Sequence, residues 1–81
     1  MLHLIRVRYL AADNAQPSRI VLRSDYEKQT VTLYRDYSYS DIIDQVKDYL
    51  CTLSYTMDDF IGAATWGAET FLISTVFRRI R

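Results

Sequence analysis

The sequence predicts an α+β fold, in which one helix packs on one face of a mostly antiparallel sheet to give a two-layer sandwich. Two observations lead to this fold class. Apolar and polar side chains alternate along residues 2–10, 19–24 and 30–36, and the apolar spacing changes to three and four over residues 38–53. The last third returns to strand-like composition, so the expected order of elements is β-β-β-α-β-β.

The composition agrees with one small folded domain over residues 1–81. Hydrophobic residues make up 49% and charged residues 25% of the chain, which are ordinary values for globular proteins. Ten basic and ten acidic side chains give a formal net charge of zero, which argues against a uniformly basic nucleic-acid binder. The basic charge falls mainly on residues 1–24 and 60–81, and the acidic charge on residues 25–59.

The first element is a half-buried strand over residues 2–10. Ile5 and Val7 alternate there with Arg6 and Arg8, so the arginines are expected on the face away from the core. The only proline of the chain, Pro17, lies in the turn-forming stretch that follows.

Residues 19–24 and 30–36 repeat the alternation and predict a hairpin, with residues 25–29 as a polar loop. The side chains expected to face the core are Ile20, Leu22, Val31 and Leu33.

Residues 38–53 predict an amphipathic helix with Ser38 or Ser40 as its N-cap. The apolar face is expected to hold Ile42, Ile43, Val46, Tyr49, Leu50 and Leu53. The opposite, solvated face is expected to hold Asp41, Asp44, Gln45, Lys47, Asp48 and Thr52.

The last third predicts a second hairpin, with strands over residues 60–66 and 70–77 and Gly67 near the turn. The alternative is a helix over residues 58–68 capped by Asp58, which the alanines of that stretch favour.

Residues suited to catalysis are few, and we expect no enzyme, no cofactor and no metal site. Cys51 is the single cysteine, so no disulfide forms within the chain, and one Cys and one His are too few for a structural zinc site. His3, near the start of the chain, is expected to be incidental, and a Cys51–His3 dyad is disfavoured. No apolar run approaches the length of a membrane span, so we expect a cytoplasmic protein.

Arginines provide the first candidate binding surface. Arg6, Arg8, Arg19 and Arg23 all point away from the predicted core, with Tyr34 expected beside them on one open sheet face. A guanidinium group suits carboxylate or phosphate, and a basic, aromatic sheet face is typical of some single-strand binders. Arg78, Arg79 and Arg81 are expected to form a basic tail.

Two further sets of residues are candidates for partner binding. Tyr37 and Tyr39 flank the corner between strand and helix, and tyrosine is common at protein interfaces. The carboxylates of Asp41, Asp44 and Asp48 form an acidic stripe on the helix.

These features predict a non-catalytic, intracellular protein-binding module, such as a phage- or plasmid-encoded regulator or inhibitor of a host protein or nucleoprotein complex. The alternative is a domain that binds single-stranded nucleic acid through the arginine-rich sheet face. The edge strands of a five-stranded sheet also allow a homodimer.

Overall fold

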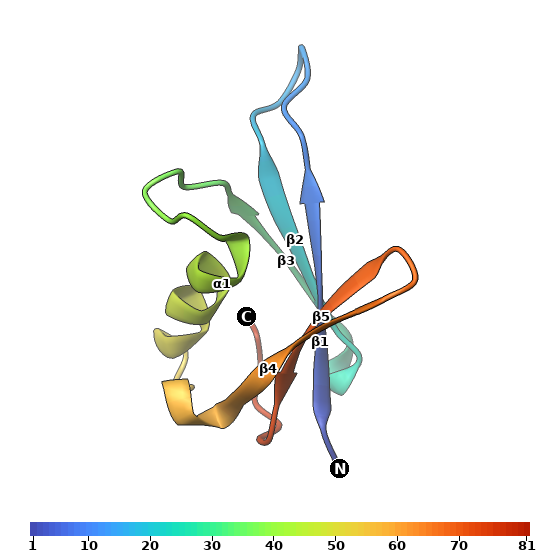
Figure 1. Ribbon diagram of the computed structural model, residues 1–81, viewed down its shortest axis with the longest axis vertical. Helices are drawn as coiled ribbons and strands as arrows, with labels where there is room; N and C mark the ends of the chain where they lie inside the picture. Colours follow the sequence, from blue (N-terminus) through green and yellow to red (C-terminus); the bar gives the residue numbers. More distant parts are fainter.

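The computed structural model describes the backbone of residues 1–81 and every side chain except that of Glu27. The sheet has five antiparallel strands in the order β3-β2-β1-β5-β4, with one helix between β3 and β4 (Figure 1). The elements are β1 (His3–Leu10), β2 (Arg19–Ser24), β3 (Gln29–Tyr34), α1 (Ile42–Cys51), β4 (Phe60–Trp66) and β5 (Glu69–Ser74). The predicted α+β class and order of elements are confirmed. No helix among the described residues is long and apolar enough to cross a bilayer.

The core lies between the sheet and α1. The inward positions of β1 and β2 are buried as the alternation predicts, with Ile5, Ile20 and Leu22 completely inaccessible. Val46 and Leu50 on α1 and Leu72 on β5 complete the centre of this layer. The opposite sheet face has no helix over it, and we call it the open face.

The predicted N-cap of the helix is wrong by one to three residues. Asp41 caps α1, and its Oδ1 accepts a hydrogen bond of 2.9 Å from the backbone N–H of Ile43. Ser38 instead closes a local turn, in which its N–H donates to Oδ1 of Asp36 at 2.9 Å. Asp41 therefore occupies the N-cap position of α1, so Ser38 and Ser40 lie upstream of the helix and do not cap it.

Gln45 was expected on the solvated helix face, and this is also wrong. It is buried, because its side-chain amide forms hydrogen bonds with the backbone at the end of β3 and just after it. Its Nε2 donates to the carbonyl of Tyr34 at 2.8 Å, and its Oε1 accepts from the N–H of Asp36 at 3.0 Å. Both backbone groups would otherwise lack a partner at this helix–sheet junction.

The second hairpin is confirmed and the alternative helix over residues 58–68 is wrong. β4 and β5 pair antiparallel from Trp66↔Glu69 to Phe60↔Ser74, and Gly67 takes the positive φ of +64° that the turn requires. A register shift between Phe60 and Gly62 marks a β-bulge at Ile61.

The end of the chain is not the free basic tail that the sequence suggested. β5 ends at Ser74 rather than residue 77, and the following segment returns to the helix side of the sheet (Figure 1). Ile80 is completely buried there, and its N–H donates to Oε1 of Gln29 at 2.8 Å. Gln29, expected in a loop, is the first residue of β3 and is buried by this contact.

Candidate functional site

The open face is built from cross-strand rows of side chains. Arg6 on β1 pairs with Arg23 on β2 and with Phe71 on β5, so these three side chains form one row. A neighbouring row contains Leu4, Ile73 and Gly62. Each row brings together residues that lie up to about seventy positions apart in sequence.

Glu69 balances part of the positive charge of this face. One of its carboxylate oxygens lies 3.1 Å from Nη2 of Arg8, and the other lies 3.8 Å from Nε of Arg6. Arg23 lies directly opposite Arg6 across the β1–β2 pair, and like charges at such positions repel. Among the described side chains Arg23 forms no salt bridge, so its guanidinium is available to an acidic group.

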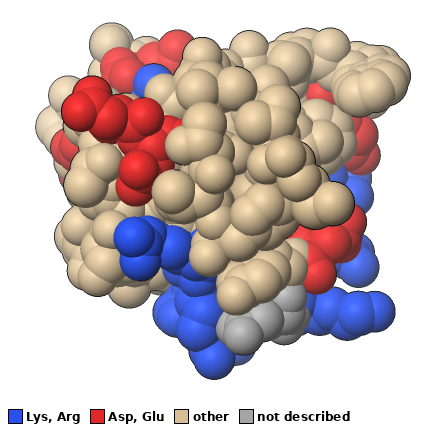
Figure 2. All heavy atoms as spheres, turned by 90° about the horizontal axis from the view of Figure 1, so that it is seen from below, with Lys and Arg blue, Asp and Glu red and all other residues tan. Residues whose placement is uncertain are grey.

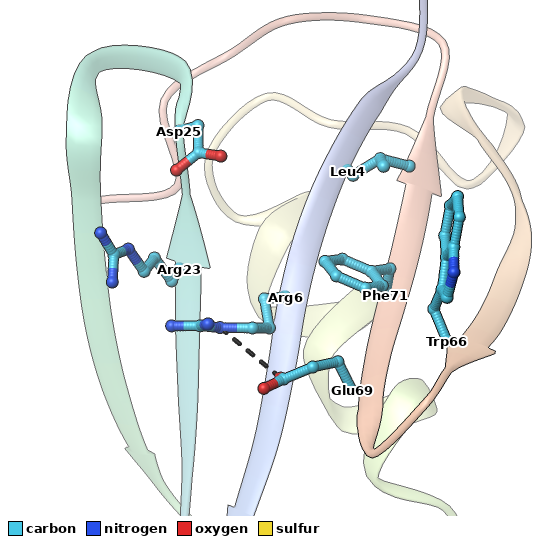
Figure 3. Close-up of a pocket in the computed structure, with 7 residues that line it drawn as sticks. All are labelled: Leu4, Arg6, Arg23, Asp25, Trp66, Glu69 and Phe71. Carbon is cyan, nitrogen blue, oxygen red and sulfur yellow. Dashed lines mark ion pairs between the residues drawn. The ribbon is translucent and has the colours of Figure 1, made fainter.

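A hollow of about 540 Å³ opens on this face, and we call it the open-face pocket. Figure 3 shows its lining: Leu4, Arg6, Arg23, Asp25, Trp66, Glu69 and Phe71. Trp66 is 75% exposed, which is unusual for so large an apolar side chain. Trp66, Phe71 and Leu4 form the apolar side of the hollow, and Arg23 and Asp25 stand across from them (Figure 3).

The structure places all four predicted arginines and Tyr34 on the open face. Only Arg6 and Arg23 line the pocket. Arg8 lies beside it through its bond to Glu69. Arg19 pairs with Tyr34 at the far end of the β2–β3 ladder, where Tyr34 is 71% exposed.

The tyrosines of the β3–α1 connection lie elsewhere and are tied to the body of the protein. Tyr37 donates a hydrogen bond of 2.8 Å to Oγ of Ser18, and the guanidinium of Arg35 lies 4.9 Å from the centre of its ring. A hydrogen bond to Asp48 raises the pKa of Tyr39, as does its partial burial. Neither tyrosine reaches the pocket.

The acidic residues of the helix are exposed but do not share one role. Asp41 caps α1, Asp48 contacts Tyr39, and Asp44 lies in the first turn of the helix. Figure 2 shows one side of the molecule, on which acidic side chains with a basic side chain among them form a group at the upper left, while most of the visible Lys and Arg side chains lie lower in the view. The separation of charge is incomplete, because another acidic group adjoins the basic ones on the right of this view.

A second polar cluster surrounds His3, which is buried rather than incidental. Its Nδ1 lies 3.1 Å from the carbonyl of Val76, which can only accept, so Nδ1 carries the proton and Nε2 accepts from the Ser24 hydroxyl at 2.5 Å. Burial lowers the pKa of His3. The Ser24 side chain is completely inaccessible, so this serine–histidine pair has no route to a substrate in this conformation.

Cys51 and His3 do not form the dyad that the sequence analysis disfavoured. The thiol of Cys51 contacts the sulfur of Met57 at 3.7 Å, whereas His3 bonds to Ser24 and Val76.

Sequence reasoning missed Leu4, Asp25, Trp66, Glu69 and Phe71 as members of the site. The alternation in residues 60–66 and 69–74 could have placed Trp66 and Phe71 on one face. Their position beside Arg6 follows only from the pairing of β1 with β5, which no local pattern reveals.

No protein-family profile, curated protein or solved structure compared with the chain matches it significantly. The geometry of the site is therefore the evidence for its role.

Proposed function

We propose that the domain is a non-catalytic protein-binding module and that the open-face pocket holds its protein partner. The observation that carries this proposal is the exposed Trp66, which lies beside Leu4 and Phe71 and across from charged groups of both signs. Trp and Arg are the residue types that most often dominate the binding energy of protein interfaces.

The chemistry of the pocket specifies the kind of segment that fits it. An apolar side chain of the partner would contact Trp66 and Phe71, and a neighbouring carboxylate would pair with Arg23. A basic group of the partner would meet Asp25, which lines the same hollow. Burial of Trp66 would supply most of the affinity, because the indole exposes a large apolar surface.

Single-stranded nucleic acid fits this face less well. Stacking on Trp66 and Phe71 would be available to bases. A phosphate near Arg6 or Arg8, however, would lie close to the carboxylate of Glu69, which already bonds to both arginines. We therefore favour the protein partner and treat nucleic acid as an outcome of the test.

The setting of this function belongs to the same proposal. A single free thiol and no disulfide agree with a reducing, cytoplasmic environment. A regulator or inhibitor of a host protein or nucleoprotein complex, encoded by a phage or plasmid, would need no more than one binding face of this size.

Site-specific photo-crosslinking in the source cell tests the proposal. A photoreactive phenylalanine replaces Thr30, which lies on the open face opposite Arg23 and outside the pocket lining. We expect one covalent adduct that protease destroys and nuclease leaves intact. Adding Arg23→Glu should abolish it, because the reversed charge would repel the carboxylate of the partner.

The control places the same photoreactive group at Asp44, on the exposed side of α1. An adduct that forms equally from both positions, or from Asp44 alone, would show that the open face is not the binding site. An adduct sensitive to nuclease would replace the protein partner with nucleic acid.

A further inference from the structure

β4 is an edge strand of the sheet, and beyond the bulge at Ile61 neither a charged side chain nor a covering element protects it. Its residues, from Phe60 to Trp66, include no charged side chain and no proline. Residues 63–68 are all exposed, so neither α1 nor a loop covers this hairpin. Natural proteins generally guard an open edge with lysine, proline or a covering element, because its free backbone groups pair readily with another strand.

The opposite edge, β3, is less available. β3 also carries neither charge nor proline, but its last carbonyl, that of Tyr34, already accepts a hydrogen bond from Gln45. On β4 the bulge at Ile61 limits regular pairing to the five residues from Gly62 to Trp66.

We propose that β4 pairs antiparallel with β4 of a second copy of this chain, with Ala64 on the two-fold axis. This register uses the whole regular segment. It places Ala64 opposite Ala64 of the second copy, Thr65 opposite its Ala63, and Trp66 opposite its Gly62. Such an isologous pair closes on itself and leaves no free β4 edge to recruit a third chain.

The side chains of β4 are self-complementary in this register. Gly62, Ala64 and Trp66 share the open face, because they pair with Ile73, Phe71 and Glu69 of β5. Trp66, the largest side chain of the segment, therefore lies opposite Gly62 of the second copy, which has no side chain. A Cβ placed on Gly62 would find no atom within 4 Å, so an indole ring can lie over it without a clash. Aromatic side chains opposite glycine stabilise strand pairs in this way.

The absence of charge favours a second copy over a charged partner strand. Identical strands related by a two-fold axis place any charge at residue 64 directly against itself, and Ala64 carries none. The paired segment is short, so the buried area falls below the roughly 800 Å² per partner of a standard interface, and the dimer should dissociate on dilution.

This proposal goes beyond the proposed function and does not rest on it. Trp66 belongs to both, because it lines the open-face pocket and would also lie over Gly62 of the second copy, so the tests use other residues. Ala64 is outside the pocket lining, and Arg23 is far from the β4 edge in the strand order. Because the two-fold axis is perpendicular to the sheet, both open-face pockets would face the same side of the dimer.

Charge exchange at Ala64 tests both the dimer and its register. Sedimentation equilibrium of the wild type should show a mass that rises from 9.5 kDa toward twice that value with concentration. Ala64→Lys and Ala64→Glu should each remain monomeric, because like charges would then lie opposite each other on the axis. An equimolar mixture of the two variants should dimerise again.

Thr32 provides the matched control, because it is an exposed, open-face residue on the β3 edge. Thr32→Lys and Thr32→Glu should dimerise like the wild type, and circular dichroism should show that all four variants fold. A wild type that stays monomeric at every concentration overturns the proposal. The register is rejected if Ala64→Lys still dimerises or if the mixture of the two Ala64 variants stays monomeric. If the Thr32 variants lose the dimer, the interface lies on β3 instead. Arg23→Glu should leave the dimer intact while removing the crosslink described above, so the two proposals fail separately.

Discussion

The Nε2 atom of His3 accepts a hydrogen bond from the Ser24 hydroxyl at 2.5 Å and holds the start of β1 against the end of β2. The other ring nitrogen donates to the carbonyl of Val76, beyond the end of β5. One neutral imidazole therefore connects three segments that meet at this end of the sheet. Its ring also stacks on Phe77 at a centroid distance of 5.0 Å.

We expect this contact to make the folded state sensitive to acid. Burial lowers the pKa of His3 below its ordinary value of 6.5, so the unfolded chain takes up the proton first as the pH falls. The stabilisation is complete above the unfolded pKa and declines as the pH drops through and below about 6.5. Urea denaturation at a series of pH values measures this decline. The His3→Gln variant should lose the part of the slope that begins near pH 6.5 and continues below it, and an unchanged slope would contradict the assignment.

Gln45→Ala should destabilise the fold by about 1–3 kcal/mol, because it removes two hydrogen bonds, to the Tyr34 carbonyl and from the Asp36 N–H, at a part-buried junction. Asp44→Asn, one position earlier and exposed, should change the free energy of unfolding by only a few tenths of a kcal/mol. Equilibrium denaturation of both variants gives the comparison. Equal effects would mean that the Gln45 amide is not a structural link.

Ile80→Ala should cost about 2–5 kcal/mol, the range for removal of a completely buried aliphatic side chain. The neighbouring Arg81 is exposed, and Arg81→Ala should have little effect on the midpoint of thermal unfolding. If Ile80→Ala unfolds at the wild-type temperature, the end of the chain is not part of the core.

Glu69→Gln should release Arg6 and Arg8 from their shared carboxylate and turn the open face into a better polyanion site. Binding of a labelled single-stranded oligonucleotide, followed by fluorescence anisotropy, should become tighter at low salt. Its dependence on log salt should steepen by about 0.7 for each arginine released. Asp58→Asn removes the same charge from an exposed position away from this face and should leave anisotropy unchanged. Equal binding by wild type and Glu69→Gln would show that Glu69 does not limit phosphate access.

The strands and the helix of this fold could be predicted because apolar side chains recur along each of them at the spacing typical of that element. Ile5, Val7, Ile20 and Leu22 are buried as the alternation of their strands requires, and Val46 and Leu50 as helical spacing requires. The wrong predictions for Gln45 and His3 were decided by groups from other segments of the chain, whereas the wrong N-cap was decided locally by Asp41. Gln45 and His3 are polar and would favour water, but carbonyl and hydroxyl groups from other segments satisfy them inside the protein.

The candidate site was only half predictable for a related reason. The outward direction of Arg6 and Arg23 follows from their own strands. The pocket requires Trp66 and Phe71 as well, and these reach Arg6 only because β5 lies between β1 and β4. Strand order depends on the whole chain, so single-sequence periodicity could not assign it.

The same strand order constrains how the protein is made. β1 is translated before β2 and β5, its two neighbours in the sheet, and its partner residues on β5 lie more than sixty positions later in the sequence. The hairpin of β1 and β2 must therefore keep one edge open until β5 has emerged from the ribosome. Such long-range pairing slows folding, and a nascent chain in this state presents the open edge of β1 to chaperones.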